Sequence, residues 1–138
     1  MASSLRHAAW SSLFTAACSV APAATDRIDA PFAAPGDAAR GREVFVAREG
    51  GHCVLCHVVP GVEVAGNVGP ALAGVGSRFT AAQLRLRVAD ITRVNPNAAM
   101  PAFHRTEGLQ REAPEYRGKP ALSGQQVEDI VAWLSTLE

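Results

Sequence analysis

A pentapeptide in the first half of the chain limits its fold more than any other feature. Cys53, Cys56 and His57 form a C-x-x-C-H sequence, the pattern at which haem is attached covalently. Two thiols that add to vinyl groups on one porphyrin edge must lie about one helical turn apart, and the next residue then lies beneath the iron. The motif therefore predicts one haem c, with Cys53 and Cys56 as attachment points and His57 as the proximal iron ligand.

Two other uses of a C-x-x-C sequence have less support. A thioredoxin-like redox pair belongs to a βαβ unit, and no strand-like alternation precedes Cys53. A structural zinc site needs a second pair of ligands. The third thiol, Cys18, lies near the N-terminus, and the one histidine far from the motif in the mature chain is His104. The redox pair therefore lacks its preceding strand, and the zinc site lacks its second pair of ligands.

The length and charge of the chain further limit the class of protein to which it can belong. The chain has 138 residues, which suits one small domain. Thirteen acidic residues balance thirteen basic ones, so nothing indicates nucleic acid as a partner. No apolar run is long enough to span a bilayer. A domain of this size has a modest core that a porphyrin would complete, so we expect the haem-free chain to be poorly folded.

The N-terminal residues differ from the rest. A weakly basic start, a short apolar stretch and the A-x-A sequence Ala21–Ala23 predict a signal peptide over 1–23. We expect export to the periplasm, because bacterial c-type cytochromes acquire haem outside the cytoplasm. Residues around Cys18 loosely resemble a lipoprotein box, so a lipid anchor through Cys18 is a second interpretation. The Ala- and Pro-rich segment 24–36 predicts a flexible lead-in, and 37–138 the folded domain.

Capping residues and apolar side chains at helical spacing predict three helices. The N-cap residues are Asp37, Thr80 and Ser123. The second and third caps form capping boxes with Gln83 and Gln126. We expect the first helix to run to about Glu49, and Asn95–Pro96 to end the second. No strand is predicted.

The sixth iron position has few candidates. Met100 lies in a proline-rich loop, 95–122, immediately before a proline. A thioether is a neutral, soft ligand that raises the reduction potential, so we expect Met100 as the distal ligand. His104 is the alternative and would give a bis-imidazole iron. Lys119 would require the loop to rearrange.

The glycine-rich loop 58–78 is expected to cover the proximal side of the haem. A ligating imidazole usually donates its second N–H to a carbonyl or carboxylate, and the backbone carbonyl of Pro70 is the candidate acceptor. The simpler alternative is that Gly69–Pro70 forms only a turn. His52 is interpreted as a surface residue.

Three arginines are candidates for binding a carboxylate such as a haem propionate: Arg78, Arg85 and Arg87. For Arg85 and Arg87 a solvated helix face is the preferred interpretation.

The order of these features resembles the class I cytochrome c fold, from about residue 37 to residue 137. The resemblance implies an all-α fold in which helices and loops wrap around one covalently bound haem. In that family the first and last helices cross closely, so Gly41 and Phe45 are expected to meet Trp133 and Leu134.

The loops carry a more specific resemblance, to the SoxX subunits of bacterial sulfur oxidation. The matching positions include Gly69-Pro70, Leu72, Val75-Gly76, Arg78, Leu84-Arg85, Asp90, Asn95-Pro96, Met100-Pro101, Phe103, Gly108-Leu109, Gly118-Lys119-Pro120, Leu122-Ser123 and the run from Gln126 to Leu134. His52 and the stretch Asn97–Ala99 depart from the pattern, and neither is a proposed ligand.

This resemblance implies a role in electron transfer. SoxX pairs with a larger haem subunit, SoxA, in an L-cysteine S-thiosulfotransferase that joins thiosulfate to the carrier protein SoxYZ. The bond-making centre lies on SoxA, and SoxX passes electrons to a soluble cytochrome c. No independent active site is therefore expected here. The alternatives are a free-standing soluble c-type electron carrier and a haem sensor whose Met100 dissociates. The long loop 104–122 favours a fixed partner, with Phe103, Leu109 and Tyr116 as interface anchors.

Overall fold

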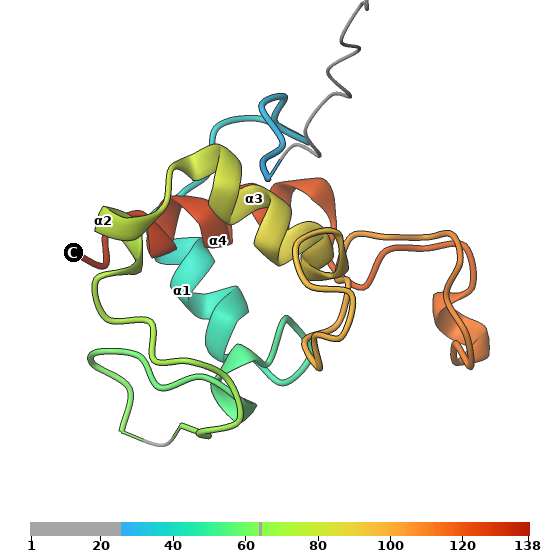
Figure 1. The fold of residues 1–138 in the computed structure, drawn as a ribbon, viewed down its shortest axis with the longest axis horizontal. Coiled ribbons are helices and arrows are strands. Elements are labelled where there is room, and N and C mark those ends of the chain that lie inside the picture. The colour runs from blue at the N-terminus through green and yellow to red at the C-terminus, as the bar shows by residue number, and fades with distance from the viewer. Residues whose placement is uncertain (1–25, 64) are drawn as a thin grey trace, which may run out of the picture.

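The computed structural model describes residues 26–63 and 65–138, which form helices joined by long loops (Figure 1). The α-helices are α1 (Ala38–Val46), α2 (Val75–Arg78), α3 (Ala81–Asp90) and α4 (Gly124–Leu134). Three short 3-10 helices are η1 (Cys53–Leu55), η2 (Ile91–Arg93) and η3 (Pro114–Tyr116). The described residues contain no strand, in agreement with the expected all-α class. The predicted signal peptide and Cys18 lie outside the described residues.

The start of α1 agrees with the sequence prediction, and its end comes earlier. The Asp37 side chain accepts a hydrogen bond from a first-turn amide, as an N-cap does. The helix stops before the expected Glu49, because the backbone at Ala47 is extended, with φ −68° and ψ 137°. The Gly51 amide then donates to the Val44 carbonyl at 3.0 Å. This turn leads directly into the C-x-x-C-H segment.

α1 crosses α4 at the centre of the molecule (Figure 1). A Cβ atom added to Gly41 would overlap the backbone carbonyl of Asp129, so only glycine permits this approach. Phe45 packs on Trp133, with ring centroids 4.7 Å apart and planes at 60°. The expected crossing is present, although Gly41 faces Asp129 rather than Trp133 or Leu134.

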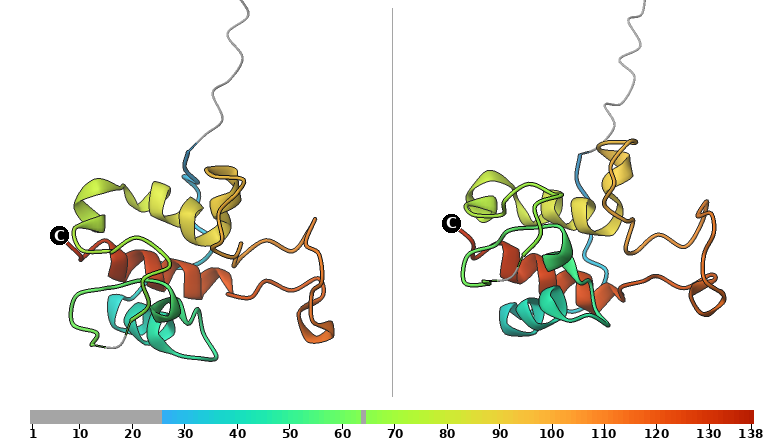
Figure 2. Two further views of the ribbon diagram at one scale, coloured as in Figure 1. Left: turned by 60° about the horizontal axis from the view of Figure 1, so that its bottom comes forward. Right: turned by 90° about the horizontal axis from the view of Figure 1, so that it is seen from below.

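α3 lies beside α4 and completes the core (Figure 2). Both predicted capping boxes are confirmed: Thr80 with Gln83 starts α3, and Ser123 with Gln126 starts α4. The large buried apolar side chains of α1, α3 and α4 are Phe45, Leu84, Leu86, Val88, Val127, Ile130, Val131, Trp133 and Leu134. Within the described residues, no helix has both the length and the apolar character needed to cross a membrane.

The described residues before α1, 26–37, form what we call the N-terminal strap. The Phe32 amide donates to Glu128 Oε1 at 3.0 Å, and Arg85 Nη1 donates to the Ile28 carbonyl at 2.7 Å. These contacts tie the strap to α3 and α4. The expectation of a flexible lead-in over 24–36 did not anticipate them, because their partners lie far away along the chain.

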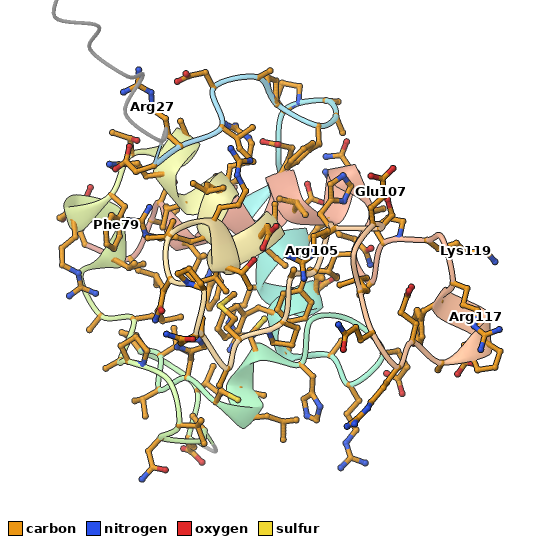
Figure 3. All side chains as sticks on the ribbon, turned by 45° about the vertical axis from the view of Figure 1, so that its right-hand side comes forward. Arg27, Phe79, Arg105, Glu107, Arg117 and Lys119 are labelled. Atoms are coloured by element: carbon orange, nitrogen blue, oxygen red, sulfur yellow. The ribbon has the colours of Figure 1, made fainter. Side chains whose placement is uncertain are left out.

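The loop between η2 and α4 contains a projection, residues 104–121, that we call the arm (Figures 1 and 2). Its base is held together where the Leu122 amide donates to the Phe103 carbonyl at 2.9 Å. His104 Nδ1 lies 2.8 Å from the Leu122 carbonyl oxygen at the same point. Arg117 and Lys119 lie at the outer end of the arm (Figure 3).

Candidate haem site

A cavity of about 640 Å³ lies between the C-x-x-C-H segment, the loop before α2, and helices α3 and α4. A volume of this size suits a prosthetic group rather than a single ion. The walls are mainly apolar and include Phe45, Val75, Phe79, Leu84, Val88, Ile91, Phe103, Ile130 and Leu134. Cys53, Cys56, His57 and Met100 also line it. The structure thus brings all four residues that the sequence predicted for haem to one cavity.

The two cysteines sit on a single helical turn. The amides of Cys56 and His57 donate to the Cys53 carbonyl at 3.1 and 3.0 Å, which sets the one-turn separation that two thioether bonds require. Both thiols are free, with Cys53 partly buried and Cys56 exposed. Burial raises the pKa of the Cys53 thiol to about 12, so this thiol is protonated at neutral pH. Among the described residues, no group of three or more His, Cys, Asp or Glu side chains could hold a metal ion by itself.

The proximal side is built on His57. Its Nδ1 atom lies 2.7 Å from the Pro70 carbonyl oxygen. A carbonyl oxygen can only accept, so Nδ1 carries the proton and the Nε2 lone pair remains available to a metal. The sequence identified Pro70 as the candidate acceptor from the chemistry of ligating imidazoles.

Gly69 has a role that the sequence analysis missed. A Cβ atom on Gly69 would lie 2.5 Å from Cε1 and 2.8 Å from Nδ1 of His57. The backbone of Gly69 therefore packs directly on the imidazole, and its amide donates to the Cys56 carbonyl at 2.8 Å. Sequence spacing offered only a Gly-Pro dipeptide, which is also typical of an ordinary turn.

Met100 approaches the cavity from the other loop. The turn before it is fixed at Asn95, whose carbonyl accepts from the Ala98 amide at 3.0 Å and whose side chain accepts from the Asn97 amide at 3.1 Å. After Met100, the His104 amide donates to the Ala89 carbonyl of α3 at 3.0 Å. The loop is therefore held on both sides of the methionine.

The alternative distal residues lie elsewhere. His104 Nδ1 is within hydrogen-bond distance of the Leu122 carbonyl, and its ring packs at a tilt against Phe32 with centroids 4.3 Å apart. His104 does not line the cavity. Lys119 is on the arm, away from the cavity (Figure 3). His52, interpreted as a surface residue, is half-buried at the cavity rim with a left-handed backbone, φ 45°.

The three candidate arginines do not all lie at the cavity. Arg78 and Arg87 line the cavity, whereas Arg85 does not. Arg85 is buried on the far side of α3, where Nε and Nη2 donate to both oxygens of Glu128 at 2.7 and 2.9 Å. The preferred interpretation of Arg85 and Arg87 as parts of a solvated face is therefore wrong for Arg85. It missed the pairing because Glu128 lies in another helix.

Glu128 and its neighbour Asp129 are buried carboxylates with depressed pKa values. Burial alone would raise the pKa of Glu128, but the hydrogen bonds from Arg85 and the Phe32 amide outweigh it and lower the pKa below its ordinary value. The hydrogen bond from Arg40 is the main cause that lowers the pKa of Asp129. Both groups are therefore charged at neutral pH and hold the strap and α1 against α4.

The family model for cytochrome c matches residues 38–138. The chain belongs to the cytochrome c family, and the family carries covalently bound haem c. It is also similar to a chain in the crystal structure of SoxXA from P. pantotrophus, with 36% sequence identity and a TM-score of 0.74. The similarity covers 81% of this chain and 90% of that one. No match was found among curated proteins.

Proposed function

We propose that the chain is a SoxX-type monohaem cytochrome c that relays electrons as the small subunit of a SoxAX-type complex. The observation that carries this proposal is the likeness to SoxXA, at 36% identity over 90% of the matched chain. In this proposal a SoxA-like larger cytochrome is the partner in a heterodimer.

We propose the following roles for the cavity residues. Cys53 and Cys56 would hold the haem through two thioether bonds, and His57 and Met100 would bind its iron. The Pro70 carbonyl accepts a hydrogen bond from the Nδ1–H of His57, which would keep Nε2 directed at the metal. When bound, haem c supplies a one-electron iron couple. With His57 and Met100 both bound to it, the iron would have no position left for a substrate, which supports electron relay rather than catalysis.

The reaction of the complex follows from the family role. In this proposal the SoxA-like subunit carries the thiosulfotransferase chemistry on a SoxYZ-like carrier, and the present chain takes the electrons and passes them to a soluble cytochrome c. We propose that the chain is exported to the periplasm after loss of residues 1–23. Cys18 falls within that segment, so lipidation at Cys18 would instead leave the chain anchored to a membrane.

The arm supports a fixed partner over a free carrier. Tyr116 is 52% exposed at its tip, and tyrosine is among the residues most often found at the centre of protein interfaces. Phe103, another expected anchor, lines the cavity instead, so Leu109 and Tyr116 remain as candidates. The hydrogen bond between the Leu122 amide and the Phe103 carbonyl joins the two ends of the arm. This restraint limits the conformations of the arm before binding, which lowers the entropic cost of docking.

Gentle purification of the tagged chain from its native host tests the proposal. We expect a larger c-type cytochrome to co-elute in equal amount, identified by mass spectrometry. A haem protein that elutes alone at all salt concentrations would instead support the free-standing carrier. We expect Tyr116→Ala to weaken the complex about tenfold, which corresponds to about 1.4 kcal/mol. The matched control is Val94→Ala, an exposed apolar residue outside the arm.

A further inference from the structure

The loop of residues 91–103, which we call the methionine loop, has both ends held at the C-terminus of α3. Asp90 is the last residue of α3 and leads directly into the loop. Directly after the loop, the His104 amide donates to the Ala89 carbonyl at 3.0 Å. The next residue, Arg105, donates from Nη1 to Asp90 Oδ2 at 3.4 Å. The residues that precede and follow the loop therefore meet at one point of the fold.

Three side chains, Asp90, Thr92 and Arg105, close this point, and we call them the clamp. Arg105 Nη1 donates to Thr92 Oγ1 at 3.0 Å, and the Thr92 hydroxyl donates to Asp90 Oδ1. A threonine hydroxyl has one proton to give and lone pairs to accept with, so Thr92 can make both contacts at once. The Thr92 amide donates to the same carboxylate oxygen at 3.1 Å. The clamp thus joins position 92 to position 105, on either side of Met100.

The clamp is partly shielded from solvent. The side chains of Asp90 and Arg105 are 13% and 35% exposed, and Figure 3 shows Arg105 against the body of the molecule rather than at the outer end of the arm. Hydrogen bonds between charged groups are stronger than neutral ones. The Nε atom of Arg105 is buried and has no partner among the described residues. Buried donors without a partner are rare, so stability alone does not account for this arginine.

The segment around Met100 has few restraints of its own. Among the described residues, Ala99, Met100 and Pro101 take part in no hydrogen bond. The position of the sulfur therefore depends on the turn at Asn95 and on the closure of the loop at its ends. A ligand carried on a loop binds with an effective concentration that depends on how tightly the loop is held. Opening the clamp would let the methionine sample more positions and spend less time at a metal.

We propose that Asp90, Thr92 and Arg105 are positioning residues for Met100, because their clamp closes the methionine loop and keeps the sulfur at the iron. This inference rests on the proposed haem site. None of the three side chains lines the cavity, so they act through the loop rather than by contact with the cofactor. Weakening the clamp should make the sulfur leave more often, although both proposed iron ligands are still present.

The first test is a pair of substitutions at Thr92 in the full-length holoprotein. Thr92→Val removes the hydroxyl and keeps the shape of the side chain, whereas Thr92→Ser keeps the hydroxyl. Stopped-flow binding of CO to the reduced protein measures how often the sulfur leaves, because CO needs the position that the sulfur holds. We expect Thr92→Val to bind CO about threefold to tenfold faster, the range that corresponds to one lost hydrogen bond. Thr92→Ser should bind CO at the rate of the unmutated protein.

A second pair separates positioning from general stability. Arg105→Gln removes the charge from the clamp and should accelerate CO binding to a similar extent. Arg40→Gln is the matched control, because it breaks an ion pair with Asp129, at 2.9 Å, that joins α1 to α4 and lies outside the methionine loop. We expect Arg40→Gln to lower the melting temperature and to leave the rate of CO binding unchanged.

The outcomes separate this inference from the haem site itself. Equal rates of CO binding in Thr92→Val, Thr92→Ser and the unmutated protein would overturn it. Equal acceleration in Arg40→Gln would also overturn it, because the effect would then be a general loss of stability. Absence of the sulfur-to-iron charge-transfer band from the unmutated, haem-loaded protein would instead overturn the assignment of Met100 as the distal ligand. If Arg105→Gln does not accumulate, the comparison of the two Thr92 variants decides the question.

Discussion

The Nδ1 atom of His57 lies 2.7 Å from the carbonyl oxygen of Pro70, and the backbone of Gly69 covers the face of the same imidazole. One dipeptide therefore fixes both the tautomer and the plane of the proposed proximal ligand. The carbonyl determines which nitrogen keeps the proton, and the absence of a side chain at Gly69 lets the ring lie flat against the loop.

The packing at Gly69 gives the first prediction. Gly69→Ala should displace the imidazole, because the new Cβ would meet three of its ring atoms at 2.5–2.9 Å. Overpacking of this kind costs about 1–3 kcal/mol, and we expect a lower holoprotein yield and a lower melting temperature. Asn67→Ala, at an exposed position in the same loop, is the matched control. Equal yields and melting temperatures for the two variants would contradict the packing role.

The attachment residues are tested by substitution. Cys53→Ala or Cys56→Ala leaves a single thiol, so each should sharply reduce the amount of haem retained after acid–acetone extraction. Mass spectrometry of the purified chain measures the covalent adduct. A normal amount of holoprotein with both sites replaced would rule out the attachment assignment.

The distal position is tested by a matched pair. Met100→Leu keeps an apolar side chain of similar size and removes the sulfur, so we expect a lower reduction potential, loss of the sulfur-to-iron charge-transfer band, and rapid CO binding. His104→Leu removes only the contacts with Leu122 and Phe32 and should cost about 0.5–1.5 kcal/mol of stability for the lost hydrogen bond while preserving the band. If His104→Leu loses the band and Met100→Leu keeps it, His104 is the distal iron ligand.

Removal of haem should abolish cooperative folding. The cavity of about 640 Å³ is lined by core side chains of α1, α3 and α4, so those groups lose their packing partner. Burial of on the order of 400 Å² of apolar porphyrin corresponds to roughly 10 kcal/mol as an upper estimate. Scanning calorimetry of the chain with both attachment cysteines replaced should show no sharp transition. A cooperative transition close to that of the holoprotein would refute this expectation.

The decrease in the free energy of unfolding at acid pH should depend on Asp129. Its pKa is lowered in the folded protein, chiefly by the hydrogen bond from Arg40. A depressed folded pKa contributes stability that is fully present above the unfolded value, about 3.9, and is lost as the pH falls through the lower folded value. Asp129→Asn does not titrate, so the holoprotein variant should be less stable at neutral pH and lose less stability below about pH 4.

Denaturant unfolding at a series of pH values measures this difference. Asp29→Asn is the matched control, because Asp29 is exposed and pairs with Arg27 at the surface, at 3.0 Å. We expect the control to lose as much unfolding free energy at acid pH as the unmutated protein does. If the free energy of unfolding falls equally with decreasing pH in Asp129→Asn and in the unmutated protein, the buried carboxylate does not contribute to stability through its charge.

Local sequence was sufficient for the features that depend on residues three or four apart. Thr80 with Gln83 and Ser123 with Gln126 make their capping bonds within one turn, so their identity alone predicts the helix starts. The spacing of Cys53, Cys56 and His57 similarly fixes the geometry of the attachment turn. These interactions join residues within one helical turn, so they do not depend on the rest of the fold.

Tertiary structure decided which of several chemically similar residues reaches the cavity. Met100 and His104 are close in sequence, but only Met100 lines it, because the His104 ring is held between Phe32 and the Leu122 carbonyl. Arg85 and Arg87 lie in one helix, yet Glu128 holds Arg85 on the opposite side. The C-x-x-C-H motif by itself determined the cofactor class, and the capping residues determined three helix starts. The distal residue, the arginines at the cavity and the docking of the strap depend on partners tens of residues away, whose positions are set only when the core packs.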